Sequence, residues 1–116
     1  KLKNEHDHMW NDAMSQKLGQ AYLRVAVESP NLAVERRLEM LNNAEANLKD
    51  SLRHRDEDYR AASHYELSKV AYRKFTLSRD RAFLADARNE IEKALQISDE
   101  TRFLTWLEYL DHAELE

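Results

Sequence analysis

The sequence contains no cysteine, a single glycine and a single proline among its 116 residues. The absence of cysteine excludes thiol catalysis, disulfides, iron–sulfur clusters and cysteine-based zinc sites. Because Gly19 is the single glycine, the chain cannot form a phosphate-binding loop, a dinucleotide fingerprint or a nucleophile elbow. A run of about 18 apolar residues, which a membrane span requires, is also lacking. The composition therefore favours a helical domain that lacks glycine- or cysteine-dependent chemistry.

Charge is plentiful but balanced, with 18 Lys and Arg against 22 Asp and Glu and a net charge of −4. Nucleic acid is not an expected partner, because neutralising phosphates requires a concentrated basic face. The hydrophobic content of 42% and the length fit one helical domain over residues 1–116. No secretory signal or membrane segment is visible, so we expect a cytoplasmic protein. Since the chain starts at Lys1 rather than Met, we expect a piece of a longer protein.

Apolar residues recur every three to four positions along the whole chain, which predicts an all-α fold of about five helices. The first helix is expected over Glu5 to Glu28, and the second continues to about Leu52, with Ser29 as its cap and Pro30 in its first position. The third follows the acidic residues 56–58 and runs to about Leu77, and Ser78 or Asp80 caps the fourth. A short fifth helix follows residues 98–101. The stripe predicted to be buried on the first helix comprises Trp10, Ala13, Met14, Leu18, Ala21, Tyr22 and Val25.

Small residues recur where paired helices would approach closely. In the third expected helix Leu67-Ser68 is followed by Ala71, and in the fourth Ala87, Ile91 and Ala94 form a ladder. These residues resemble the pattern of a tetratricopeptide repeat. The first two helices match less well, through Leu18-Gly19 with Tyr22 and through Ala44, Leu48 and Ser51. The intervals between matching positions exceed the family's period of about 34 residues, so the resemblance is to a degenerate repeat with long helices.

The resemblance implies antiparallel helical hairpins in a right-handed superhelix whose first helices line a concave groove. The alternative is a four- or five-helix bundle without a repeat. The residues that the resemblance places in the groove are Gln20, Arg24, Tyr65, Lys69, Tyr72, Arg73, Arg102 and Tyr109. Lys and Arg pair with carboxylates, and Tyr supplies apolar area and a hydroxyl, so the expected partner is an acidic peptide or a free C-terminal carboxylate. The competing interpretation makes the tyrosines packing residues and the charges an ordinary solvated face.

The five histidines give no convincing metal or catalytic site. Glu5-x-x-His8 has the helical spacing of di-iron bundles, but a second copy is missing, and the pair Glu108 and His112 lies near the chain end. We expect no metal and no cofactor. His54 is expected in an exposed turn with the acids of residues 56–58 as its partners, and His64 is expected to be a satisfied core histidine. A metal-loaded bundle enzyme stays as a third class of function.

The last helix is strongly amphipathic, with Phe103, Trp106, Leu107 and Leu110 on one face. It either folds back as a cap or docks a partner, the simplest being a second copy in a symmetric dimer around Trp106. The sequence therefore predicts a non-catalytic protein- or peptide-interaction module. The alternative is a helical sensor domain of a larger bacterial signalling or transcription-regulating protein that binds a peptide or small effector.

Overall fold

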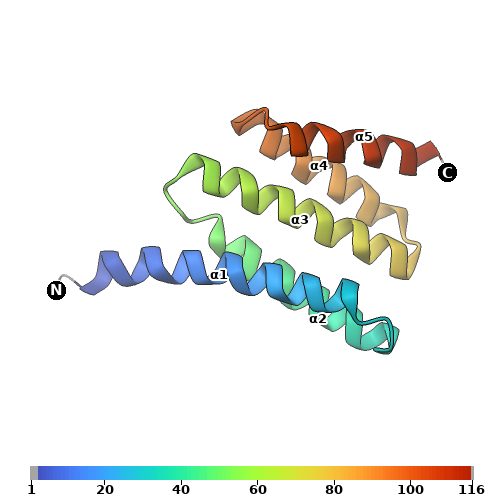
Figure 1. Ribbon diagram of the computed structural model, residues 1–116, viewed down its shortest axis with the longest axis horizontal. Coiled ribbons are helices and arrows are strands. Elements are labelled where there is room, and N and C mark those ends of the chain that lie inside the picture. Colours follow the sequence, from blue (N-terminus) through green and yellow to red (C-terminus); the bar gives the residue numbers. More distant parts are fainter. Residues whose placement is uncertain (1–2, 116) are drawn as a thin grey trace.

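The computed structural model describes the backbone of residues 3–115 and the side chains of residues 14–115. Within these bounds the chain forms five helices and no strand (Figure 1). The helices are α1 (Lys3–Glu28), α2 (Val34–Ser51), α3 (Glu57–Ser78), α4 (Arg81–Ile97) and α5 (Thr101–Leu115). The predicted all-α class with about five helices is confirmed.

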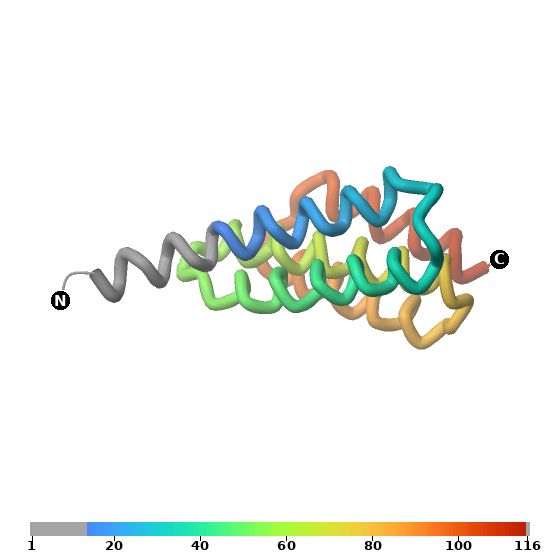
Figure 2. The backbone as a smooth tube through the Cα atoms, turned by 90° about the horizontal axis from the view of Figure 1, so that it is seen from below, coloured from blue at the N-terminus to red at the C-terminus, as the bar shows by residue number. Residues whose placement is uncertain are grey.

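The helices are arranged in two layers. Helices α1, α3 and α5 lie side by side in one layer, and α2 and α4 form the other (Figure 1, Figure 2). Each helix packs against the next along the chain, and α1 also contacts α3 directly. The helices form two antiparallel hairpins, α1–α2 and α3–α4, followed by α5. The tetratricopeptide-like repeat and its superhelical turn stay predictions.

The predicted capping residue is found in α4 but not in α2, and α3 begins at Glu57, inside the acidic run rather than after it, with Asp56 as its cap. Asp80 accepts a hydrogen bond from the amide of Ala82 at 3.0 Å, as a side-chain cap should. The prediction that Ser29 caps α2 was wrong, because residues 29–32 form a turn closed by the Leu32 amide on the Ser29 carbonyl at 3.1 Å. Pro30 occupies the second position of this turn. The fixed φ of proline suits this position, as it would also suit the first position of a helix. Helix α2 therefore begins at Val34.

The buried face of α1 is not the predicted one. Gly19, Leu23 and Ala26 face the core, whereas Leu18 and Val25 are 45% and 41% exposed. A methyl group on Gly19 would lie only 2.5 Å from Cγ of Leu48 in α2, so this glycine sets how closely α1 and α2 approach. Of the remaining predicted stripe, Met14 and Ala21 are also exposed and Tyr22 is half-buried, while Trp10 and Ala13 lie outside the described side chains. The exposed residues form a second apolar stripe along α1.

The second hairpin uses small residues as predicted. Ser68, Ala87 and Ala94 are fully buried, and the hydroxyl of Ser68 donates to the carbonyl of Ala87 at 2.6 Å. Phe103 and Leu110 of α5 are fully buried in the same cluster, so the last helix folds back onto the α3–α4 hairpin. Burying apolar area in this way stabilises the domain by roughly 25 cal/mol per Å².

Polar side chains also join neighbouring helices. Lys74 on α3 pairs with Glu45 on α2, with 2.8 Å between Nζ and Oε1. The amide of Gln16 on α1 donates to the hydroxyl of Ser63 on α3 at 2.9 Å. In the described part of the chain, no helix combines the length and the apolar character needed to cross a bilayer.

Candidate functional site

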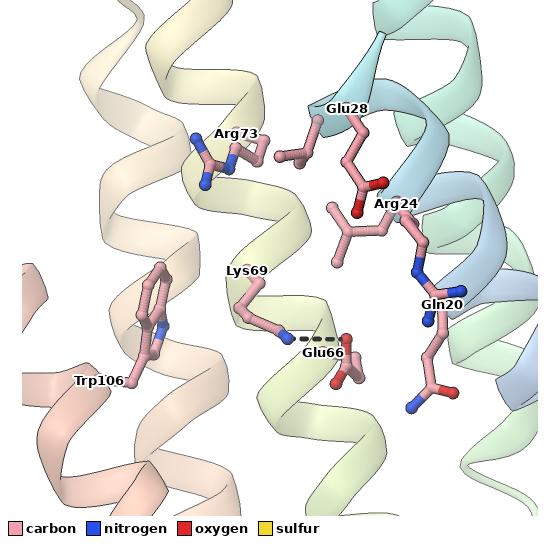
Figure 3. Close-up of a pocket in the computed structure, with 9 residues that line it drawn as sticks. Gln20, Arg24, Glu28, Glu66, Lys69, Arg73 and Trp106 are labelled. Atoms are coloured by element: carbon pink, nitrogen blue, oxygen red, sulfur yellow. Dashed lines mark ion pairs between the residues drawn. The ribbon is translucent and has the colours of Figure 1, made fainter.

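A groove of about 360 Å³ opens between α1, α3 and α5 (Figure 3). It is called the central groove below. Its lining combines charged, apolar and aromatic side chains: Gln20, Leu23, Arg24, Val27, Glu28, Glu66, Lys69, Arg73 and Trp106. The groove therefore lies on the layer formed by the odd-numbered helices.

Helix α3 supplies the middle of the central groove. Lys69 and Arg73 stand one helical turn apart, and Nζ of Lys69 lies 3.2 Å from Oε1 of Glu66. Figure 3 shows Lys69 reaching toward this carboxylate. Only 9% of the Glu66 side chain is exposed, so the lysine offsets a carboxylate that has little contact with water. The ring of Tyr72 lies 5.7 Å from the guanidinium carbon of Arg73.

Helix α1 supplies one wall of the groove. Leu23 is buried and Val27 half-buried, so they give an apolar base, while Arg24 and Glu28 extend over the groove (Figure 3). Arg24 makes no ion pair with any described side chain, and neither does Arg73 on α3. The lining thus carries three cations against two carboxylates, an excess of positive charge in a chain whose net charge is −4.

Helix α5 supplies the other wall through Trp106, whose orientation is fixed. Its indole N–H donates to the hydroxyl of Ser68 at 2.7 Å, and its ring stacks on Tyr109 with centroids 5.2 Å apart. Tyr72 packs edge-on against the same indole at 5.4 Å. A half-buried aromatic ring held in this way offers contact area at little entropic cost.

A second cavity of about 300 Å³ adjoins the central groove and shares Trp106 with it. It lies between α3 and α5 and is lined by Tyr65, Arg102, Thr105, Trp106 and Tyr109. The Lys69 ammonium and the Arg102 guanidinium lie 4.7 and 5.1 Å from the centroid of the Tyr65 ring. Arg102 is also bound to Glu100, with 3.0 Å between Nε and Oε1. Cations therefore gather around aromatic rings along the whole α3–α5 seam.

The predicted site residues divide among three cavities. Gln20, Arg24, Lys69 and Arg73 line the central groove, and Tyr65, Arg102 and Tyr109 line the adjoining cavity. Tyr72 lines a third cavity near the end of α3, where its hydroxyl lies 2.8 Å from that of Tyr109. That these residues bind a partner stays a prediction.

Sequence reasoning overlooked several groove residues, Glu66 and Trp106 among them. Glu66 lies three positions before Lys69, a spacing that signals a helical ion pair. Trp106 was expected on a face of the last helix that caps the domain or docks a partner, although it lies four residues after Arg102 and three before Tyr109, on the same helical face. A symmetric dimer around Trp106 stays a prediction, and the indole is already engaged within the chain.

His64 and His54 are both held by contacts within the folded chain. Nδ1 of His64 lies 2.8 Å from Oε1 of Glu90, and both side chains are largely buried. Burial raises the pKa of Glu90, but the hydrogen bond to His64 and the charges of Lys93 and His64 outweigh this effect, so the pKa is lowered overall. His54 is half-buried rather than exposed, because it accepts a hydrogen bond from the Asp56 amide at 3.1 Å and stacks on Tyr59. Its partners are therefore not the neighbouring carboxylates.

Among the described side chains, no group of three His, Asp or Glu residues is placed to hold a metal ion. The predicted helical pair of Glu5 and His8 lies outside those side chains, and Glu108 and His112 are exposed. The chain matches no protein-family model, and no curated protein or solved structure resembles it closely enough to indicate a relative. The geometry of the site therefore carries the functional argument by itself.

Proposed function

We propose that the chain is a non-catalytic interaction module that holds an extended, acidic segment of a partner protein in the central groove. The observation that carries the proposal is the meeting of Arg24, Lys69 and Arg73 from two helices beside the fixed ring of Trp106. The arrangement of hairpins is compatible with the tetratricopeptide-like repeat that the sequence resembles, and that repeat forms part of the proposal.

The charges favour a carboxylate-bearing ligand. Since Lys69 is already paired with the buried Glu66, Arg24 and Arg73 are the cations that a ligand carboxylate would meet first. Guanidinium groups bind carboxylates through two parallel hydrogen bonds, which adds geometric selectivity to the attraction. A side-chain carboxylate or a free C-terminus fits this chemistry.

The apolar groups favour a peptide over a simple anion. Leu23 and Val27 form an apolar base beside the cations, and Trp106 offers the face of a ring. A ligand residue with an aliphatic or aromatic side chain next to an acidic one would bury apolar area and pair its charge at the same time. The adjoining cavity around Tyr65 would take the next residues of an extended segment.

The test is a selection of random peptides against the purified chain, compared with a Lys69→Glu, Arg73→Glu variant. We expect enrichment of peptides that combine Asp or Glu with a large apolar residue, and a loss of at least tenfold in affinity for the variant. A matched control is Lys49→Glu, Arg53→Glu, which has the same residue types and spacing near the end of α2 and should leave binding unchanged. Far-UV circular dichroism would establish that both variants keep their helices.

Two results would contradict the proposal. One is the enrichment of basic peptides, or equal binding by wild type and the groove variant. The other is equal loss of binding in the groove variant and the control, which would mean that net charge rather than the groove governs affinity. Selected peptides should also bind less tightly as salt rises, because the attraction between charges is screened.

A small effector is the second candidate ligand, and one observation favours it. The volume of about 360 Å³ lies within the range of about 300–1,000 Å³ typical of small-molecule sites. The chain would then be a sensor domain of a larger regulator. This candidate would be favoured if the selection enriches no peptide and a dicarboxylate raises the thermal midpoint of wild type but not of the groove variant.

A further inference from the structure

The two outer helices of the odd-numbered layer expose faces with the same residue spacing. On α1, Met14, Leu18, Ala21 and Val25 are exposed, and on α5, Leu104, Glu108, Asp111 and Leu115 are exposed. Both sets advance by four, three and four residues, so each forms one stripe about 17 Å long at about 1.5 Å per residue. These sets are called the α1 end face and the α5 end face.

The end faces lie at opposite edges of the molecule. Figure 1 shows α1 and α5 on the two sides of α3, and both run in the same direction along the layer. The core sides of these helices are occupied, by Leu23 and Ala26 in α1 and by Phe103 and Leu110 in α5. The end faces are therefore surfaces left over after the domain has packed.

Apolar side chains on the end faces are well exposed. Leu18 and Val25 are 45% and 41% exposed on α1, and Leu104 and Leu115 are 47% and 85% exposed on α5. Scattered exposed apolar residues are ordinary, but on α1 they follow one another at helical spacing and form a strip that a second helix can cover. On α5 the two leucines stand at the ends of the face, with Glu108 and Asp111 between them. Covering both faces at once would remove this apolar area from water.

The charges on the two end faces have opposite signs. Between positions 14 and 25 the charged residues are Lys17 and Arg24, which flank the α1 end face, with no acidic residue; Arg24 also lines the edge of the central groove. Between positions 104 and 115 they are Glu108, Asp111 and Glu114, with no Lys or Arg. Asp111 and Glu114 also lie near Arg88 of α4, whereas Glu108 makes no ion pair with a described side chain.

We infer that the α1 end face of one copy binds the α5 end face of another, so that the chain associates head to tail. A symmetric pairing of like faces would bring Lys17 and Arg24 against their own copies, or Glu108 and Asp111 against theirs, and like charges repel. Pairing of unlike faces sets leucines against the apolar strip and carboxylates against the basic residues. Such a contact is heterologous and open, so it propagates into short linear oligomers.

This inference does not rest on the proposed peptide binding, because the face variants can leave the central groove intact. Leu18→Glu blocks the α1 end face by placing a carboxylate opposite the acids of α5. Leu104→Lys blocks the α5 end face by placing an ammonium opposite Lys17 and Arg24. Neither Leu18 nor Leu104 lines the central groove.

The test is sedimentation velocity of the full chain at concentrations up to about 1 mM, which is the weak end of measurable association. Wild type should form a ladder of species that grows with concentration and shrinks as salt rises from about 0.01 to 0.15 M. Each face variant should be monomeric alone. An equimolar mixture of Leu18→Glu and Leu104→Lys should give heterodimers and nothing larger, because the intact α5 end face of the first binds the intact α1 end face of the second and the other two faces are blocked.

Ala46→Glu is the matched control, because it adds a carboxylate to an exposed position of α2 that belongs to neither end face. It should associate like wild type. A wild-type chain that stays monomeric at low salt would overturn the inference. So would a face variant that still dimerises alone, because that outcome requires pairing of like faces or a surface elsewhere. Thermal midpoints and circular dichroism of all variants establish that each is folded.

Discussion

Gly19 is the position at which the packing of the first hairpin can be tested most sharply. Replacing it by alanine should stabilise an isolated helix by about 1 kcal/mol, because glycine is the poorer helix former. In the folded chain, however, the new Cβ would lie 2.5 Å from Cγ of Leu48 and 3.2 Å from the carbonyl oxygen of Ala44. Leu48 is fully buried, so its side chain cannot swing into solvent. Overpacking of this kind costs about 1–3 kcal/mol, which leaves Gly19→Ala destabilising by about 1 kcal/mol.

Urea unfolding followed by circular dichroism would measure this change as a shift of the midpoint at constant slope. The exposed Ala21 on the same helix provides the calibration, since Ala21→Gly should cost about 1 kcal/mol through helix propensity alone. The decisive step is to repeat Gly19→Ala in a Leu48→Ala background, where the obstructing side chain is gone. There the substitution should become stabilising by about 1 kcal/mol, a coupling of about 2 kcal/mol between the two sites.

A Gly19→Ala variant more stable than wild type would refute the reasoning, because it would mean that α1 and α2 are free to move apart. Additive effects of Gly19→Ala and Leu48→Ala would refute it as well. Either result would leave the single glycine without a packing role.

Two further predictions concern charge and backbone conformation. Because the pKa of Glu90 is lowered from 4.5 in the folded state, its pairing with His64 stabilises the fold at pH above 4.5, and this stabilisation is lost as pH falls through the lowered value. Urea midpoints of wild type and Glu90→Gln should therefore differ at pH 7 and converge below pH 4.5; a constant difference would contradict the assignment. Arg79 ends α3 with a φ of 64°, a left-handed conformation that costs a non-glycine residue about 1–2 kcal/mol. Arg79→Gly should raise the free energy of unfolding by about 0.5–1 kcal/mol after the entropy of glycine in the unfolded chain is counted. A lower free energy of unfolding, measured with urea, would contradict this prediction, because it would mean that the arginine side chain stabilises the fold by more than the strain costs.

The number and order of the helices could be predicted from the sequence because helix formers, caps and apolar spacing agree along most of the chain. Asp80 illustrates this agreement, since its side chain and position both mark a helix start, and the structure shows it bound to the Ala82 amide. The dipeptide Ser29-Pro30 shows where prediction of helix starts from sequence fails. The same dipeptide suits a helix start and a turn, and the closing hydrogen bond to the Ser29 carbonyl decides for the turn.

The buried face of α1 could not be predicted because two apolar stripes run along it. Leu18 and Val25 belong to one stripe and Leu23 and Ala26 to the other, and periodicity alone does not rank them. The tertiary contact of Gly19 with Leu48 selects the second stripe and leaves the first exposed.

Half of the predicted groove residues line the central groove, since residues at helical spacing share a face wherever the helix is packed. Lys69 and Arg73 follow this rule. Tyr72, one position before Arg73, instead joins the aromatic rings of α5, and Trp106 enters the groove because its indole is bound to Ser68. The buried face of α5 is the one that its amphipathic pattern predicts, with Phe103 and Leu110 fully buried. That Trp106 on this face also borders a groove with α1 depends on how the helices pack together, which no local pattern contains.

The measurement that tests the proposed groove most directly is an amide and indole chemical-shift map of the chain during titration with a peptide from the selection. The proposal predicts that the largest changes fall on Arg24, Lys69 and Arg73 and on the indole N–H of Trp106. Changes confined to the opposite layer, around Lys49 and Lys93, would contradict it, because those residues line a separate cavity between α2 and α4.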